Sequence, residues 1–330
     1  MRCQKLMMGF VLSTTLVTLA VAVPPTGAVG RPGAEGRVTK AEPGTRAGAG
    51  GSAGASAGAS AGASAGAGSA AGTTAESPAG TTAGDRAGDK AAGVSLFRGR
   101  AFDTCLAPSV DTMRRWSSSD YKAVGVYFGG RGRACPRQPH LSHGWMRAVR
   151  GQGWKVLPLY VGSQSPCVIS KNKKHVRMGR YPVQQGTREG RDAVKRAKSF
   201  GMRAGSPLYL DMEAYNYRQV ECGKTTLAFV RAWNREVRGS GYVPGFYSSA
   251  NFGVRHMETA RRAGVRDLPS VIWFARWHKR PSLYNEPVLR KNAWQERRIH
   301  QYAGNVKEKH GGRTLKIDRN LVHAPVARIS

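Results

Sequence analysis

The sequence predicts an α/β protein that folds as a (β/α)8 TIM-like barrel, with irregular last units and a disordered linker before it. Two observations support this prediction. Short β-rich segments recur at fairly regular intervals after residue 94, and polar segments with helical periodicity follow most of them. Alternating strands and helices imply a parallel sheet, and eight strands favour closure into a barrel. Residues 95–330 have the length of one such domain.

Eight strands and three clear helices make up the expected domain. The strands are expected at Arg98–Thr104, Ala123–Gly129, Lys155–Val161, Pro207–Glu213, Val243–Ser248, Val271–Trp277, Arg298–Ala303 and Leu315–Asn320. The helices are expected at Gly186–Phe200, Lys224–Gly239 and Ala250–Ala263, where apolar residues recur every three or four positions and a glycine lies at or near the end. The last two strands are too close together for full helices between them.

The N-terminus has the pattern of an export signal. Residues 1–28 contain a short basic start, an apolar run from Leu6 to Val23 and small residues ending at Ala28. No Arg-Arg pair precedes the run, which favours the general secretory (Sec) route. The run is also about long enough to span a bilayer, so an uncleaved anchor remains an alternative. Either way, we expect a secreted, extracellular protein associated with the cell wall.

A second segment, residues 29–94, is dominated by Gly, Ala, Ser and Thr and contains a four-residue repeat between Ser52 and Ser60. Large apolar side chains are missing from the middle of this segment, so nothing compensates for the entropy lost on ordering it. We interpret it as a disordered linker, either a tether to the wall or a low-complexity insertion.

The net charge of +32 is concentrated in the expected domain. Residues 95–330 carry 44 of the 52 Lys and Arg residues but only 15 of the 20 Asp and Glu residues. Anionic wall polymers are therefore expected partners. Specific nucleic-acid binding is disfavoured because the bases are spread and no nucleic-acid motif is present. No nucleotide-binding motif occurs and the histidines are scattered, so we expect a monomer without cofactor or metal.

Four cysteines follow the signal segment, and each comes shortly after one of the first four expected strands. In an exported protein, an even number of cysteines without Cys-x-x-Cys spacing indicates disulfides rather than a zinc site. Four cysteines allow three pairings. Neighbour order favours Cys105 with Cys135 and Cys167 with Cys222.

Carboxylates gather at the expected strand ends. Asp103 ends the first strand, Asp211 and Glu213 end the fourth on one face, and Asp318 ends the eighth. Barrel enzymes place reactive groups at this rim, and in a closed barrel Asp103 and Asp318 become neighbours. A carboxyl with raised pKa beside an ionised one is what glycosidic-bond cleavage requires. The alternative is a structural role, in which the acids pair with arginines or cap turns.

Aromatic and amide side chains at the same rim fit a sugar ligand. Rings stack on the C–H faces of sugars, and an amide can bond a hydroxyl or N-acetyl group. The expected substrate-binding residues are Tyr127, Tyr160, Tyr247, Trp277 and Gln301. Rings on barrel strands are also common in cores, so a packing role remains open for some of them.

Together these residues resemble a known family. The chain is similar to the actinobacterial exported glycoside-hydrolase-like domains, and more distantly to glycoside hydrolase family 25 muramidases. The resemblance rests on the order and spacing of Phe102-Asp103, Tyr127-Phe128-Gly129-Gly130, Leu159-Tyr160, Asp211-Met212-Glu213, Gly245-Phe246-Tyr247-Ser248, Trp273-Phe274-Ala275-Arg276-Trp277, His300-Gln301-Tyr302 and Ile317-Asp318-Arg319-Asn320.

This resemblance implies a TIM-like barrel in which Glu213 matches the proton donor. Asp211 and Asp103 match acids that assist the developing cation or orient an N-acetyl group, and Asp318 matches the last acid of the site. Arg276 departs from the muramidase pattern and places a cation near the site. The expected function is hydrolysis of a wall glycan such as peptidoglycan. The alternative is a non-catalytic, cationic module that binds wall glycan or teichoic acid.

Overall fold

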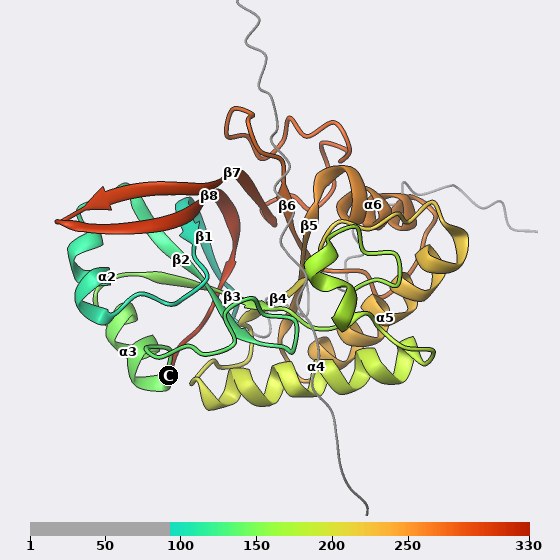
Figure 1. Cartoon of the computed structure of the whole chain (residues 1–330), viewed down its shortest axis with the longest axis horizontal. Coiled ribbons are helices and arrows are strands. Elements are labelled where there is room, and N and C mark those ends of the chain that lie inside the picture. The colour runs from blue at the N-terminus through green and yellow to red at the C-terminus, as the bar shows by residue number, and fades with distance from the viewer. Residues whose placement is uncertain (1–92) are drawn as a thin grey trace, which may run out of the picture. The chain divides into compact units, whose positions relative to one another are not determined.

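The domain is a closed eight-stranded barrel, as the sequence predicts. The computed structural model describes residues 93–330, so the expected signal peptide and all but the last two residues of the expected linker lie outside the described residues. The strands follow one another around the barrel in chain order, and the eighth closes it against the first (Figure 1). Their bounds are β1 Ser95–Asp103, β2 Tyr121–Gly129, β3 Lys155–Tyr160, β4 Pro207–Asp211, β5 Val243–Ser249, β6 Val271–Ala275, β7 Arg298–His310 and β8 Arg313–Val326.

The last strand runs against the others. Strands β1 to β7 pair in parallel, each with the next, whereas β8 pairs antiparallel with both β7 and β1. The expectation of a parallel sheet is therefore wrong for this strand. Only Gly311 and Gly312 separate β7 from β8, with φ angles of 52° and 79°. Two residues cannot carry the chain back along the barrel, so the connection is a hairpin turn.

Helices cover the outside of the barrel between most successive strands. Their bounds are α2 Val110–Trp116, α3 His143–Gly151, α4 Pro182–Ser199, α5 Val220–Gly239 and α6 Arg255–Arg262, with a 3-10 helix η1 at Lys171–Val176 and a π-helix η2 at Ala250–Val254. The third of the clearest expected helices is thus a π-helix that continues into α6, and α2 and α3 are further helices between strands. No helix lies between β6 and β7 within the described residues, which confirms the irregular last units.

Helices α4 and α5 lie side by side (Figure 1) because α4 presents glycines to its neighbour. A Cβ atom added at Gly186 would lie 2.4 Å from the carbonyl oxygen of Phe229, and one at Gly190 would lie 2.9 Å from Cβ of Glu236. On α5, Phe229, Trp233 and Val237 are buried at helical spacing. The two helices therefore pack closely against the same side of the barrel.

Two hydrophobic clusters follow from the alternation of side chains along each strand. One fills the barrel and includes Ala101, Leu159 and Trp273, and the other lies between the strands and the helices and includes Phe102 and Phe128. Residues two apart on a strand share a face. A residue that lies two positions after an interior residue, at the end of its strand, therefore points into the mouth of the barrel.

Two disulfides lie near the ends of the first four strands, one between two loops and one between a loop and the first turn of α5. Cys105 pairs with Cys135 and Cys167 pairs with Cys222, which confirms the predicted pairing. Such bonds persist in oxidising compartments, so they fit an exported protein.

Among residues 93–330, no helix has both the length and the apolar character needed to cross a membrane.

Candidate functional site

The inward faces of five strands each place a polar side chain at the barrel mouth. Asp103 follows Ala101 on β1, Asp211 follows Tyr209 on β4, and Gln301 follows Ile299 on β7, each two positions after a residue of the interior cluster. Tyr127 on β2 and Tyr247 on β5 pack against that cluster. Strand periodicity alone therefore gathers these groups at one rim.

All four predicted acids line one cleft of about 650 Å³. Its wall combines these acids with two lysines, the Cys105–Cys135 disulfide and an apolar extension. The lining residues are Asp103, Thr104, Cys105, Leu106, Ala107, Pro108, Ser109, Thr112, Tyr127, Ala134, Cys135, Pro139, His140, Val161, Lys173, Asp211, Glu213, Asn305, Thr314, Leu315, Lys316 and Asp318. A cavity of this size accommodates a small-molecule-sized ligand or one part of a polymer chain.

Asp103 is the most strongly held of these acids. Its side chain is buried, and it accepts hydrogen bonds from Tyr127 Oη at 2.8 Å, Asn320 Nδ2 at 2.8 Å and Gln301 Nε2 at 3.1 Å. Burial, followed by the negative charge of Asp318, raises the pKa of the Asp103 carboxyl to about 7, and the three donors oppose this rise. Asp103 therefore holds its proton more readily than an exposed aspartate does.

Gln301 connects this acid to two aromatic side chains. Its Oε1 accepts hydrogen bonds from Tyr247 Oη and Trp277 Nε1, each at 3.0 Å. With Oε1 accepting from both rings, Nε2 points towards Asp103 and, at 3.5 Å, towards Asp318. Gln301, Tyr247 and Trp277 do not line the cleft. Gln301 contacts the acids, and the two rings contact Gln301.

Asp211 is buried at the end of β4, and its Oδ1 atom has no hydrogen-bond partner among residues 93–330. Burial raises the pKa of the Asp211 carboxyl well above its ordinary value, and the charge of Glu213 adds to this rise whereas Lys173 opposes it. An unpartnered buried carboxyl oxygen on a cleft wall is free to bond a ligand.

Glu213 follows two residues later, where the strand has ended, and 38 % of its side chain is exposed. Its Oε1 lies 3.9 Å from Nζ of Lys173, a side chain only 12 % exposed that also donates to the carbonyl oxygen of Gly132 at 2.8 Å. Glu213 is therefore an accessible carboxyl with a cation beside it.

Asp318 comes from the reversed strand β8 and lies opposite Asp103 in the β1–β8 pairing. The predicted proximity of these two acids thus holds, although Asp318 lies early in an antiparallel strand rather than at the end of a parallel one. Burial raises the pKa of Asp318 above its ordinary value, whereas the 2.6 Å hydrogen bond from the Asn305 backbone N–H opposes this rise.

Gln164 clamps the segment that carries Asp211 and Glu213. Its Oε1 accepts from the Glu213 backbone N–H at 2.8 Å, and its Nε2 donates to the Asp211 backbone carbonyl at 2.9 Å. Gln164 is itself buried and fixed, because its backbone bonds Val176 and Met178 on the segment around η1. Gln164 therefore fixes Asp211 and Glu213 relative to the loop after β3.

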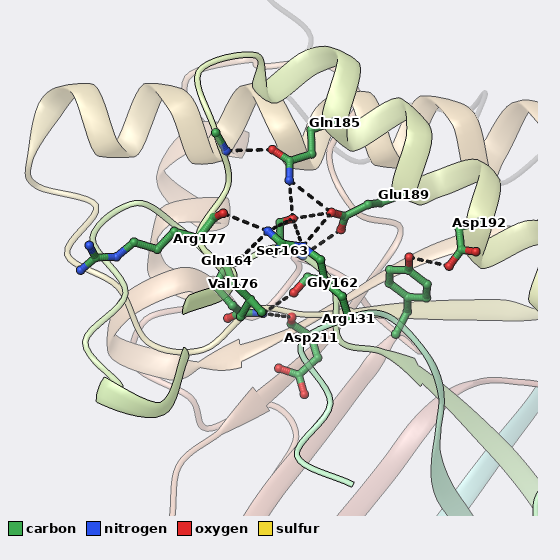
Figure 2. A network of polar contacts seen from close by, with 12 residues as sticks. Arg131, Gly162, Ser163, Gln164, Val176, Arg177, Gln185, Glu189, Asp192 and Asp211 are labelled. Carbon is green, nitrogen blue, oxygen red and sulfur yellow. Dashed lines mark hydrogen bonds and ion pairs between the residues drawn. The ribbon is translucent and has the colours of Figure 1, made fainter. Parts of the chain in front are cut away.

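The clamp belongs to a larger network of polar contacts (Figure 2). The neighbouring Ser163 hydroxyl donates to Glu189 on α4 and accepts from Arg131 Nη2 at 2.9 Å and Gln185 Nε2 at 2.6 Å. Arg131 also donates to the Val176 carbonyl at 2.9 Å. These contacts tie the β2, β3 and η1 loops to α4 and hold the clamp in place.

Two sequence-based expectations about the site do not agree with the geometry. Tyr160 follows the inward Leu159, so it points outwards, is buried among Phe128 and Trp233, and donates to Asp192 on α4 at 2.8 Å. The expectation that it binds substrate placed it on the wrong face of β3.

Arg276 does not bring its charge to the acids. Its guanidinium pairs with Glu286 through contacts of 2.5 and 2.6 Å and donates to Asn251 Oδ1 at 2.9 Å. The structure thus directs the cation of the sixth strand towards these two partners.

Two important residues were missed at the sequence level. Gln164 follows β3 in a polar Gly-Ser-Gln-Ser stretch, and its place just after a strand was an available signal. Lys173 lies on η1, far along the connection to α4, where no strand periodicity marks its direction.

The arrangement favours acid–base chemistry carried by carboxyl groups. One accessible and three more buried carboxyls share the cleft, and burial raises the pKa of all three of the buried ones. Within residues 93–330, no group of three or more His, Cys, Asp or Glu side chains is arranged to hold a metal ion.

Residues 114–322, more than half of the chain, match the family described as Rv2525c-like, glycoside hydrolase-like domain. The chain belongs to this family. None of the curated proteins matches it in sequence. The description "glycoside hydrolase-like" covers the fold and the sequence pattern of the family and names no substrate.

The chain is similar to several solved structures at low identity. The Tat-secreted protein Rv2525c of Mycobacterium tuberculosis is 17 % identical over 68 % of this chain and 96 % of its own, with a TM-score of 0.48. An uncharacterized B. stearothermophilus protein is 19 % identical over 68 % and 95 %, with a TM-score of 0.47. A muramidase from Acremonium alcalophilum is 14 % identical over 68 % and 93 %, with a TM-score of 0.41. At these values the likeness assigns no role to any residue.

Proposed function

We propose that this domain is an exported glycoside hydrolase that acts on an amino-sugar glycan of the cell wall, such as peptidoglycan. The observation that carries the proposal is the convergence of Asp103, Asp211, Glu213 and Asp318 on one cleft, where the side chain of Glu213 is 38 % exposed. Family membership supports the reaction class.

Glu213 is the proposed general acid. Its carboxyl gives a proton to the glycosidic oxygen as the bond from that oxygen to the anomeric carbon breaks. The cationic sugar that develops is stabilised by Asp211 or Asp103, directly or through the sugar's N-acetyl group. Water then adds to the anomeric carbon and returns a proton to Glu213, so that Glu213 and Asp211 again hold one proton between them.

The interaction between the carboxyls of Asp211 and Glu213 helps to retain the proton that this step requires. Because the negative charge of Glu213 contributes to the raised pKa of Asp211, the two carboxyls hold on to one proton more readily than isolated acids do. Transfer of that proton from Asp211 to Glu213 upon substrate binding leaves Asp211 ionised, which suits its assisting role.

One observation favours the second candidate, a non-catalytic module that binds wall glycan. Lys173 Nζ lies 3.9 Å from Glu213 Oε1, so the carboxyl that is required to act as the acid is instead engaged in an ion pair. A module of this kind needs the cleft and the positive charge of the domain, but no proton donor.

The deciding experiment compares Glu213→Gln with Glu221→Gln, which removes an exposed carboxylate from the first turn of α5. We expect the wild-type chain to release reducing sugar from purified wall glycan, Glu213→Gln to lose this activity by about a hundredfold or more, and Glu221→Gln to retain it. Circular dichroism verifies the fold of each variant. Undiminished activity of Glu213→Gln excludes its proposed role, and glycan binding by the wild type without any release establishes the second candidate.

A further inference from the structure

Strands β7 and β8 continue beyond the barrel as a two-stranded arm. In this arm Val306, Lys307, Glu308, Lys309 and His310 pair with the segment from Ile317 back to Arg313, and its tip lies beside α2 (Figure 1). Successive side chains point to opposite faces of such a ribbon. The arm therefore has one face towards the barrel and one towards solvent.

The inner face is fully partnered. Glu308 accepts from Arg319 Nε at 2.5 Å and from Tyr121 Oη at 2.8 Å, and it contacts His310 Nε2 at 2.9 Å. The His310 ring packs on Trp116 at 4.7 Å, and Ile317 is buried. This face fixes the arm to the body of the domain.

The outer face is basic, and Lys316 on it opposes the upward shift in the pKa of Asp318 two residues along β8. Lys307 lies directly opposite Lys316 in the register, Lys309 is on the same face, and all three are exposed. None of the three forms an ion pair with a carboxylate in the part of the chain that the structure describes. Like charges opposite one another on a sheet repel, so this face is less stable alone than with an anion bound to it.

The basic face is continuous with the cleft. Lys316 and Thr314 on the arm line the cleft, as does Asp318 two residues further along β8. A polymer that places one unit among the acids can therefore extend over Lys316 and along the arm towards Lys309.

We propose that the outer face of the β7–β8 arm, formed by Lys307, Lys309 and Lys316, binds the acidic groups of an anionic glycan whose chain passes through the cleft. The direction of the glycan rests on the proposed function, because that function puts one sugar among the acids. The acidic groups are carboxylates or phosphates, both of which a lysine binds as a point charge.

The composition of the face favours a glycan over a nucleic acid. Its other exposed positions include Thr314 and Asn305, and it presents no aromatic ring on which a base could stack. Its charges are lysines rather than the arginines that bind phosphate and base edges in bidentate fashion.

The test uses the full chain carrying Glu213→Gln, so that binding is measured without cleavage. The ligands are soluble chitin oligosaccharide and its carboxymethylated and phosphorylated forms, which share a backbone and differ in charge. The arm variant Lys307→Gln/Lys309→Gln/Lys316→Gln is compared with Lys195→Gln/Lys198→Gln/Lys291→Gln, which removes three exposed charges from α4 and the β6–β7 loop.

We expect the arm variant to bind one or both charged forms about tenfold more weakly at low salt, with a smaller dependence of affinity on salt, and to bind the neutral form unchanged. The control variant should lose less than about threefold. Which charged form responds identifies the acidic group. Equal losses in both variants, or tighter binding of single-stranded DNA through the same lysines, would overturn the proposal.

Failure of the proposed function gives a different result. One outcome is that no variant binds the neutral oligosaccharide while the charged forms still bind through the arm. The arm site then stands, and only the statement that the glycan chain passes through the cleft is refuted. If the neutral form binds and the arm variant behaves like the control, the cleft site stands and the arm site is refuted.

Discussion

Asp103 and Asp318 are cross-strand partners in the antiparallel β1–β8 pair, so two carboxyl groups meet on one wall of the cleft. Burial and this neighbouring charge raise the pKa of Asp103 to about 7. A carboxyl with a raised pKa binds more protons in the folded than in the unfolded protein. Its contribution to stability is therefore lost as the pH rises from about 4 to about 7.

Asp103→Asn removes this titration while keeping the size of the side chain. We expect the free energy of unfolding of the variant, relative to the wild type, to increase between pH 4 and pH 8 by at most about 4 kcal/mol. Urea unfolding at both pH values measures this difference. Asp120→Asn, at a side chain that is 79 % exposed beside Arg100, is the control and should show no comparable trend. Parallel pH dependences for Asp103→Asn and the wild type would contradict the prediction.

Gln164 acts as a positioning residue because it bonds the backbone of both β4 acids and does not line the cleft. Gln164→Leu should lower kcat by about a hundredfold with less than a threefold change in KM, since small displacements of reacting groups cost that much. Steady-state kinetics on wall glycan measure both constants. The matched control is Gln152→Leu, a residue whose Nε2 bonds the Val110 carbonyl at 3.2 Å. A change confined to KM would show that Gln164 does not position the acids.

Lys173 opposes the upward shift in the pKa of Asp211. Lys173→Met should raise that pKa further, so Asp211 keeps its proton to higher pH. The basic limb of the pH–rate profile of kcat/KM should then move to higher pH. Lys174→Met removes an exposed charge from the same 3-10 helix and should leave the profile in place. An unmoved basic limb in Lys173→Met would mean that the proton on Asp211 does not limit the reaction.

Tyr127 and Tyr160 form a matched pair, because each donates one hydrogen bond of 2.8 Å to an aspartate on opposite faces of the sheet. Tyr127→Phe removes a donor from Asp103 and raises the pKa of that carboxyl above about 7. We expect an activity loss of about tenfold or more, from loss of a bond to a charged group. Tyr160→Phe should cost about 1 kcal/mol of stability without changing activity. Thermal unfolding and kinetics of both variants separate these effects, and equal activity losses would refute the assignment of faces.

Much of the fold could be predicted because local patterns encode it. Each local pattern, whether an apolar strand, a periodic helix or a turn, involves only a few neighbouring residues. Together these patterns predicted the barrel and its irregular end. The direction of β8 could also have been inferred, since Gly311-Gly312 leaves room only for a hairpin. The expectation of a parallel β8 was wrong because it assumed that this strand repeats the direction of the strands before it.

The side chains behind the acids depend on longer-range information. Tyr160 was assigned to the mouth because it ends a strand, whereas the inward direction of Leu159 decides its face. Arg276 directly follows β6 and Lys173 lies on η1, far along the chain from β3, but of these two cations only Lys173 lines the cleft. Arg276 instead pairs with Glu286, and no spacing in the sequence predicts that pair.

The sequence by itself determined the barrel and the four acids at its mouth, and it favoured one of three disulfide pairings, because strand periodicity and chain order can be read directly from it. Only the tertiary structure decided how those acids differ. Burial, the antiparallel contact of Asp103 with Asp318, the clamp by Gln164 and the cation of Lys173 all arise between segments distant in sequence. Because pKa values depend on desolvation and on charges within a few ångströms, they follow from three-dimensional packing and not from the order of residues.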